Sequence, residues 1–216
     1  MQVVTDVSDI VLVDINGYSS LSTELQLESA LYITSQLNAA LNFLLTQANR
    51  QANEIVLGFI PTGDGFYVVL SPPLAGYGIF LAITLRASLL MKRSGHKLPF
   101  SGVRLAVHNG EIAPFTDIVG KANFVGEGLN SCTRLLSARA EHSPDPSIPV
   151  DENTIVVSDA AYHQFRALCG DNTEMNDFLA SIQYAETDWF EISDKHGNVH
   201  RLRFVEASHY AAIELP

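Results

Sequence analysis

The sequence predicts an α+β fold, a mostly antiparallel sheet with helices packed on one face. Short apolar runs bounded by Gly, Pro, Asn and Asp predict strands, and longer stretches with helical spacing lie between them. Turn residues join several neighbouring strands directly, which favours hairpins over crossover connections. The chain has 216 residues, of which 47% are hydrophobic, and contains no evident linker or repeat. We therefore expect one domain spanning residues 1–216.

The first half of the chain contains three strands and two helices by these criteria. Residues 9–14 include an unbroken run of β-branched and leucine side chains, as in a fully buried strand. Residues 21–48 and 75–94 place apolar side chains at helical spacing. Residues 54–60 and 65–70 flank a Gly-Asp-Gly turn and predict a hairpin.

The second half adds two hairpins, two helices and a strand. Asn109-Gly110 is a common turn pair and predicts a turn between strands at 101–108 and 111–115. A Gly-spaced stretch precedes a helix at 128–141. The remaining elements are a strand at 154–157, a helix at 158–169 capped by Ser158, and a hairpin formed by residues 188–193 and 199–205.

Composition narrows the classes of function. The formal net charge of −11 disfavours nucleic acid or an anionic membrane as the main partner. No apolar run is long enough to span a membrane and no secretory signal is apparent, so we expect a cytoplasmic protein. Cys132 and Cys169 are too few for a disulfide framework or a zinc site, and we expect both to be small buried hydrophobes.

Two aspartates mark the ends of predicted strands. Asp14 ends the first apolar run, and Asp64 lies in the turn of the first hairpin. A carboxylate at the end of a buried strand needs a partner, and a divalent cation is an efficient one. Two such carboxylates on neighbouring strands would hold a metal pair against a nucleoside triphosphate. The alternative is that both are ordinary turn residues.

A polar pair follows on the predicted helix at 128–141. Asn130 and Arg134 are four residues apart and therefore share one helical face. A carboxamide and a guanidinium presented together suit a ribose oxygen and a developing phosphoryl charge. An ordinary helix with an exposed arginine is the alternative.

Four segments together resemble the catalytic domain of the class III nucleotidyl cyclases, the adenylate and guanylate cyclase superfamily. Segments 13–21 and 62–66 resemble the two metal motifs of that family, with Asp14 and Asp64 at the matching positions. Segment 103–112 resembles its central strands, and segment 125–134 resembles its transition-state motif. The segments occur in family order over roughly residues 8–165, and the resemblance implies a ferredoxin-like, palm-type sheet.

The resemblance implies two divalent cations, Mn²⁺ or Mg²⁺, as cofactors. Asp14, Asp64 and the carbonyl of Ile15 would bind them. One ion would lower the pKa of the ribose 3′-hydroxyl, and the other would grip the triphosphate. Asn130 would orient the ribose, and Arg134 would stabilise charge on the α-phosphate.

The resemblance also implies the triphosphate contacts and the assembly. A basic residue near the C-terminal hairpin usually contacts the triphosphate, and Lys195 is our candidate, although Arg201 is nearby and a solvated hairpin is the alternative. Because the metal-binding and Asn/Arg sets come from opposite subunits in this family, a homodimer with two composite sites is expected. The amides expected to cradle the β- and γ-phosphates belong to Asn16, Gly17, Tyr18 and Ser19.

Base recognition departs from the family pattern. Purine cyclases carry Lys or Glu four residues before the second metal aspartate, where this chain has Ile60 between Phe59 and Pro61. The companion position, seven residues before Asn130, is Asn123 rather than Asp or Thr. An apolar Ile60 with Phe59 would shrink the pocket towards a pyrimidine, and Asn123 can donate to and accept from its edge.

The chain also resembles the stand-alone bacterial pyrimidine cyclases of antiphage defence. That resemblance implies conversion of UTP, in preference to CTP, to a cyclic nucleotide that a separate effector reads. A purine cyclase with an atypical pocket and a non-catalytic nucleotide-binding or dimerisation module remain as alternatives. A diguanylate cyclase fits less well, because segment 62–66 lacks its Gly-Gly-Asp-Glu-Phe turn.

Overall fold

The computed structural model describes residues 4–48, 51–91, 100–148, 150–151, 153–170 and 172–207. Within these ranges the strands form one nine-stranded sheet, in which β4 and β6 are the only parallel neighbours. The strands are β1 (Asp6–Ile15), β2 (Val56–Pro61), β3 (Gly65–Leu70), β4 (Val103–Thr116), β5 (Ala122–Val125), β6 (Ile155–Ser158), β7 (Tyr184–Glu186), β8 (Phe190–Ser193) and β9 (Val199–Ala207). The α-helices are α1 (Thr23–Ala48), α2 (Ala52–Ile55), α3 (Tyr77–Met91), α4 (Glu127–Leu135), α5 (Asp159–Cys169) and α6 (Thr173–Ser181).

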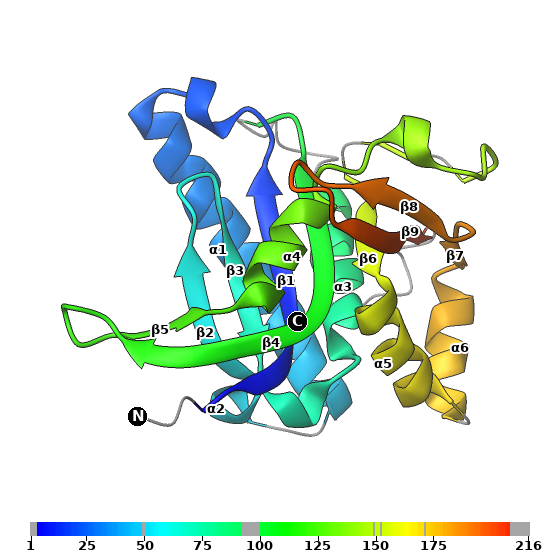
Figure 1. Ribbon diagram of the computed structural model, residues 1–216, viewed down its shortest axis with the longest axis horizontal. Helices are drawn as coiled ribbons and strands as arrows, with labels where there is room; N and C mark the ends of the chain where they lie inside the picture. Colours follow the sequence, from blue (N-terminus) through cyan, green and yellow to red (C-terminus); the bar gives the residue numbers. More distant parts are fainter. Residues whose placement is uncertain are drawn as a thin grey trace.

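The N-terminal half has a ferredoxin-like arrangement. Its elements run β1, α1, β2, β3, α3, β4, and its strands lie side by side in the order β2-β3-β1-β4. The strands β6 and β9 continue the sheet beyond β4, and β8 pairs with β9 as the predicted C-terminal hairpin (Figure 1). The predicted α+β class with a mostly antiparallel sheet is confirmed.

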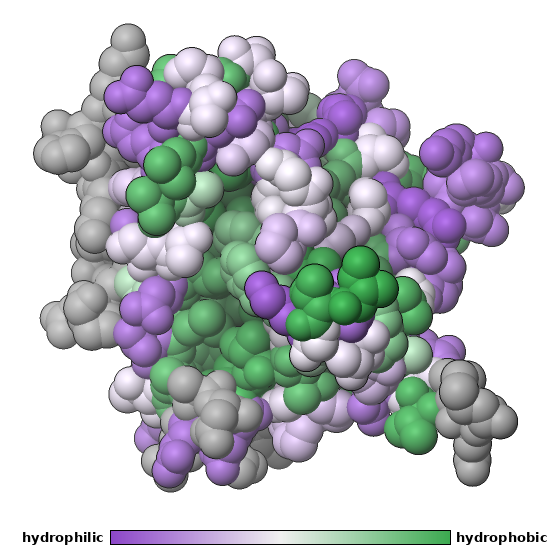
Figure 2. Space-filling view, turned by 90° about the vertical axis from the view of Figure 1, so that its left-hand side faces the viewer, coloured by the Kyte–Doolittle hydropathy of each residue, from purple (hydrophilic) through white to green (hydrophobic). Residues whose placement is uncertain are grey.

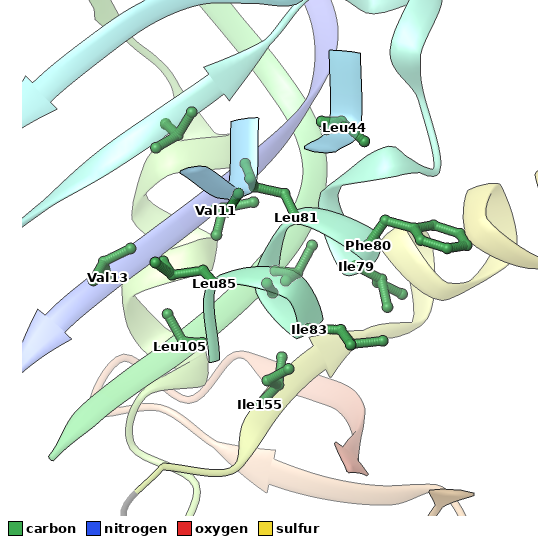
Figure 3. Close-up of a cluster of buried hydrophobic side chains, with 14 of the residues drawn as sticks. Val11, Val13, Leu44, Ile79, Phe80, Leu81, Ile83, Leu85, Leu105 and Ile155 are labelled. Carbon is green, nitrogen blue, oxygen red and sulfur yellow. The ribbon is translucent and has the colours of Figure 1, made fainter. Parts of the chain in front are cut away.

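Helices cover both faces of the sheet, because β1 is apolar on both sides. Val11 and Val13 lie in the larger core together with residues of α1, α3 and α5, and Figure 3 shows part of this core. Ile10 and Leu12 point the other way, where α4 and the β8–β9 hairpin cover them (Figure 1). The prediction that the helices share one face is therefore wrong for α4.

The predicted turn at Asn109-Gly110 is also wrong, because β4 runs straight through it. The two residues pair with Asp9 and Ser8 of β1, and the Asn109 carboxamide donates to Asp9 at 2.8 Å. A Cβ on Gly110 would lie 2.8 Å from the Cα of Gly128 at the start of α4. The glycine therefore allows α4 to approach the sheet, and strand pairing overrides the turn preference.

Other boundaries differ less. The helix predicted at 128–141 ends at Leu135 and continues as tighter turns that lead into a 3-10 segment, Ala140–His142. The helix predicted at 75–94 is α3, and its last three predicted residues lie outside the described ranges. Ser158 caps α5 by accepting from the amide of Ala161 at 3.2 Å, as predicted. The short elements α2, β5, α6 and β7 were not predicted.

Both cysteines are buried and free, as expected. The described helices include none that is both long enough and apolar enough to cross a membrane.

Candidate active site

Strand pairing brings Asp14 and Asp64 to the same end of the sheet. Asp14 is the second-last residue of β1 and pairs with Gly65, the first residue of β3. The amide of Ile15 donates to the carbonyl of Asp64 at 2.8 Å. Asp64 is exposed in the turn, whereas the Asp14 side chain is only 13% exposed. The backbones of the two aspartates that the sequence singles out thus meet at one end of the sheet.

Close backbone approach explains the Gly-Asp-Gly turn. Gly63 has a φ of 97°, in the left-handed region that favours glycine. A Cβ on Gly65 would lie 1.8 Å from the carbonyl oxygen of Val13, so only glycine fits between β3 and β1 at this point. Both glycines therefore serve to place the Asp64 turn beside Asp14.

Arg104 is a further residue of this site that the sequence reasoning missed. It lies opposite Asp14 on β4, and its Nε and Nη2 donate to the Asp14 Oδ2 at 2.8 and 2.6 Å. The sequence offered one signal for Arg104, a charged residue between two apolar ones in a predicted strand. In the structure both neighbours, Val103 and Leu105, are buried. A cavity of about 370 Å³ opens beside the pair, with Asn16 and Arg139 also in its wall.

The loop after β1 offers fewer backbone donors than expected. The amide of Asn16 donates to the Gly102 carbonyl at 2.9 Å, so it is not available to a phosphate. Within the described part of the chain, no hydrogen bond occupies the amides of Gly17, Tyr18 and Ser19. The expected phosphate cradle is therefore reduced to these three groups, immediately before α1.

Asn130 and Arg134 share the outer side of α4, while Cys132 faces the sheet and is fully buried. The Arg134 guanidinium forms ion pairs with Glu127 of its own helix and, through Nε at 3.0 Å, with Asp194. Asn130 donates to Glu127 at 3.4 Å. The described contacts of this pair do not include Asp14 or Asp64.

Asp194 begins the turn between β8 and β9, and Lys195 follows it with an exposed side chain. The residue before Lys195 in the C-terminal hairpin is thus the one that pairs with Arg134 of α4. Arg201 lies elsewhere, pairing with Asp159 and stacking over Trp189.

The three residues assigned to base recognition are not brought together. Ile60 lies beside Tyr67 on the face that α4 covers. Phe59 points to the opposite face, where it stacks on Phe66 with 4.5 Å between the ring centroids. Because alternate residues of a strand face opposite sides, Phe59 does not share a pocket with Ile60. It lines a pocket with Ile15 and Tyr18 instead.

Asn123 lies on β5, in the hairpin that projects from the sheet (Figure 1). Its neighbour Phe124 is buried beneath the hairpin, so the Asn123 side chain points to the other side. Within one chain, Asn123 and Ile60 therefore do not face each other.

The donor set at Asp14 and Asp64 fits Mg²⁺ or Mn²⁺. Carboxylate oxygens suit these hard cations, and Mg²⁺ in particular is often held by one or two carboxylates plus substrate phosphates. The described residues contain no cluster of three or more acidic, histidine or cysteine side chains that would hold a metal alone. The pair is therefore suited to cations that arrive with a triphosphate.

No protein-family model and no curated protein matches the sequence. The chain does resemble solved structures. It matches the guanylate cyclase domain of RhGC from Catenaria anguillulae in complex with GTP with a TM-score of 0.61 and 13% identity, over 94% of this chain and 97% of that one. The chain has the fold of a nucleotidyl cyclase catalytic domain.

Two further structures share the cyclase fold. The catalytic core of a rhodopsin-guanylyl cyclase with converted specificity, in complex with ATPαS, has a TM-score of 0.60 and 15% identity, covering 96% of this chain and 99% of that one. The adenylyl cyclase CyaB from P. aeruginosa has a TM-score of 0.55 and 14% identity, covering 97% and 98%. The match extends over almost the whole cyclase domain in each case.

Proposed function

We propose that this chain is a metal-dependent nucleotidyl cyclase. It would convert a pyrimidine nucleoside triphosphate, UTP in preference to CTP, to the 3′,5′-cyclic nucleotide and pyrophosphate. The observation that carries the proposal is the meeting of Asp14 and Asp64 at one end of a sheet with the cyclase fold. A turn role alone does not account for Asp14, which lies in the strand itself with a largely buried side chain paired with Arg104.

Asp14, Asp64 and the carbonyl of Ile15 would hold two divalent cations. When bound, these supply charge neutralisation for the triphosphate and a lowered pKa for the ribose 3′-hydroxyl. The ribose 3′-oxygen bonds to the α-phosphorus as the bond from that phosphorus to the bridging oxygen of the β-phosphate breaks. Pyrophosphate leaves and the hydroxyl proton passes to water.

The remaining residues of the chain bind and orient the substrate. Arg104 and Lys195 are the candidates for cationic contacts to the triphosphate, and the free amides of Gly17, Tyr18 and Ser19 add neutral donors. Asn130 would hold the ribose, and Arg134 would meet the charge that develops on the α-phosphate.

The active site would be shared between two copies of the chain. Arg134 and Asn130 are engaged on the outer side of α4, away from the carboxylate pair, so a second subunit would supply them across the interface. The β4–β5 hairpin projects with an apolar tip, where Ile118 and Val119 are 104% and 71% exposed. Figure 2 shows this side of the molecule, with a hollowed apolar surface beside the hairpin. Such exposed apolar surface is typical of an interface.

Ile60 and Asn123 support the pyrimidine preference. Across a dimer interface, an apolar wall from one subunit and a carboxamide from the other would leave room for a single ring. A carboxamide both donates and accepts, as the edge of uracil or cytosine requires. A purine cyclase is the second candidate, because two of the structural neighbours are complexes with ATPαS and GTP.

We further propose that the enzyme acts in the cytoplasm and that its product is an alarm signal in antiphage defence. A separate effector protein would read that product. This part of the proposal rests on the sequence resemblance to stand-alone pyrimidine cyclases.

The stoichiometry of the products tests the reaction class. Purified protein with Mn²⁺ should release pyrophosphate and cyclic nucleotide in equal amounts, and EDTA should stop both. Pyrophosphate with a linear monophosphate would indicate hydrolysis instead, and binding without turnover would favour the non-catalytic alternative.

A further inference from the structure

The carboxylate of Asp194 contacts both its own turn and two residues outside that turn. Its Oδ1 accepts from the amides of His196 and Asn198 at 2.8 and 3.0 Å, which closes the β8–β9 turn. Its Oδ2 accepts from the Asn198 side chain at 3.1 Å and contacts His200 Nε2 at 3.1 Å, and it forms an ion pair with Arg134 through Nε at 3.0 Å. The turn is exposed, yet the Asp194 side chain is only 4% exposed.

A second turn shows which of these bonds the turn itself needs. Asp117, at the tip of the β4–β5 hairpin, accepts from the amides of Val119 and Lys121 at 2.9 Å each, in the same i+2 and i+4 pattern. Both turns also close with the same pair of backbone bonds and a glycine at positive φ. Among the described contacts, Asp117 serves its own turn alone. A turn of this kind therefore does not require the contacts that Asp194 Oδ2 makes with Arg134 and His200.

Asp194 contacts one side of the Arg134 guanidinium. The ion pair is made through Nε, which leaves the terminal nitrogens for other partners. One of these, Nη1, pairs with Glu127, whose side chain is 63% exposed and can be displaced by a ligand. The two terminal nitrogens of a guanidinium can donate two parallel hydrogen bonds to one phosphate.

The carboxylate is held in its charged form. Burial alone would raise the pKa of Asp194, but hydrogen bonds from Asn198, His200 and His196 outweigh it and lower the pKa below the usual range. An ionised carboxylate therefore pairs with the guanidinium throughout the neutral pH range.

We propose that Asp194 is a positioning residue for Arg134, fixing the guanidinium in the orientation that meets the α-phosphate. This inference rests on the proposed cyclase activity, and it concerns an aspartate that contacts no substrate itself.

Asp194→Asn is the test variant, because its side-chain oxygen can still accept from the turn amides while the charge is lost. We expect kcat to fall by about tenfold to a hundredfold, since small misplacement of a catalytic group costs rates of this size. The KM for the nucleoside triphosphate should change by less than about threefold. Asp117→Asn, in the matching turn, should keep kcat within about twofold of wild type at a protein concentration where the dimer is shown to be intact.

A double-mutant cycle separates positioning from a general structural effect. In an Arg134→Ala background, Asp194→Asn should cause no further loss of kcat, because the residue it acts through is gone. An equal loss in both backgrounds, or an unchanged kcat for Asp194→Asn alone, would overturn the proposal. If Asp194→Asn folds poorly in thermal unfolding, Asp194→Ser carries the same expectation, since its hydroxyl can accept in the turn.

A readout without turnover separates this inference from the proposed function. The Nε–Hε NMR signal of Arg134 should have the same chemical shift in wild type and in Asp117→Asn, and a different one in Asp194→Asn, where the ion pair is lost. A wild type that turns over no nucleotide defeats the proposed function, and with it the catalytic role of Asp194, even where this difference is seen. An active wild type whose signal is unaffected by Asp194→Asn defeats the positioning role alone.

Discussion

Arg104 and Asp14 lie directly opposite each other on β4 and β1, and two guanidinium nitrogens meet a single carboxylate oxygen, Oδ2. The contact leaves Oδ1 of Asp14 for another partner. The arginine thus orients one proposed metal ligand while its own side chain, 34% exposed, borders the adjoining cavity.

Replacing Arg104 should therefore affect both metal and substrate. We expect Arg104→Ala to lower kcat/KM by about tenfold to a hundredfold, the effect of losing one or two charge-assisted hydrogen bonds. The Mn²⁺ concentration for half-maximal activity should rise as well. Arg104→Lys keeps the charge but loses the two-nitrogen contact, so its kcat/KM should lie between that of wild type and that of Arg104→Ala. An Arg104→Ala enzyme with wild-type kinetics would remove this residue from the site.

Sites shared across an interface can be rebuilt from two defective subunits. As folded homodimers, Asp64→Ala should be inactive and Arg134→Ala should retain only a small, measurable residual activity, since each lacks one half of every site. Mixing them should restore one intact site per heterodimer, and up to about a quarter of wild-type activity for statistical exchange. Absence of recovery, with subunit exchange demonstrated by mass-tagged chains, would count against a composite site.

Gly65 should tolerate no side chain. In Gly65→Ala the new Cβ would press on the Val13 carbonyl. We expect the free energy of unfolding to fall by about 3 kcal/mol, the upper end of typical overpacking costs. Gly120→Ala is the control, because its φ is 82° but nothing lies within 4 Å, and should cost only about 1 kcal/mol. Urea unfolding measures both. Equal losses would show that close approach to β1 is not what requires Gly65.

His108 should make stability depend on pH. Burial and the nearby His200 lower the pKa of His108 to about 4, and its Nδ1 lies 2.8 Å from the Ser158 Oγ. An unfolded histidine takes up its proton near pH 6.5, so between these values the unfolded state binds more protons. Stability from this residue is therefore fully present above about pH 6.5 and is lost as the pH falls towards 4.

The expected size of the effect is about 2–3 kcal/mol between pH 7 and 4.5. Urea unfolding of wild type and of His108→Gln at both pH values isolates it, because the other titrating groups are common to the two proteins. The variant should lose less stability on acidification. A parallel decline in both would mean that His108 is protonated in the folded protein.

Local sequence patterns correctly predicted the strand, the turn and the helix cap that depend on adjacent residues alone. The apolar run before Asp14 became β1, the Gly-Asp-Gly segment became the turn at Asp64, and Ser158 caps its helix. Each of these follows from a few adjacent residues. The turn expected at Asn109-Gly110 failed because pairing with β1 and the bond to Asp9, a hundred residues away, outweigh the turn preference.

The residues that support the site depend on contacts between distant parts of the chain. Arg104 meets Asp14 only because β1 and β4 pair in one particular register, and Asp194 meets Arg134 only because a C-terminal hairpin packs beside α4. Neither register nor packing can be obtained from one sequence alone. The placement of Phe59 on the face opposite Ile60 could have been foreseen, since the period of two along a strand already separates the two side chains.

Chromatography of the products from ATP, GTP, CTP and UTP, each incubated separately with Mn²⁺ and the purified protein, is the decisive measurement. We predict a 3′,5′-cyclic pyrimidine nucleotide, more from UTP than from CTP, and none when Asp14→Ala replaces the wild type. Cyclic AMP or cyclic GMP would retain the mechanism and contradict the assignment of Ile60 and Asn123. No cyclic product from any of the four would contradict the assignment of this chain as a cyclase.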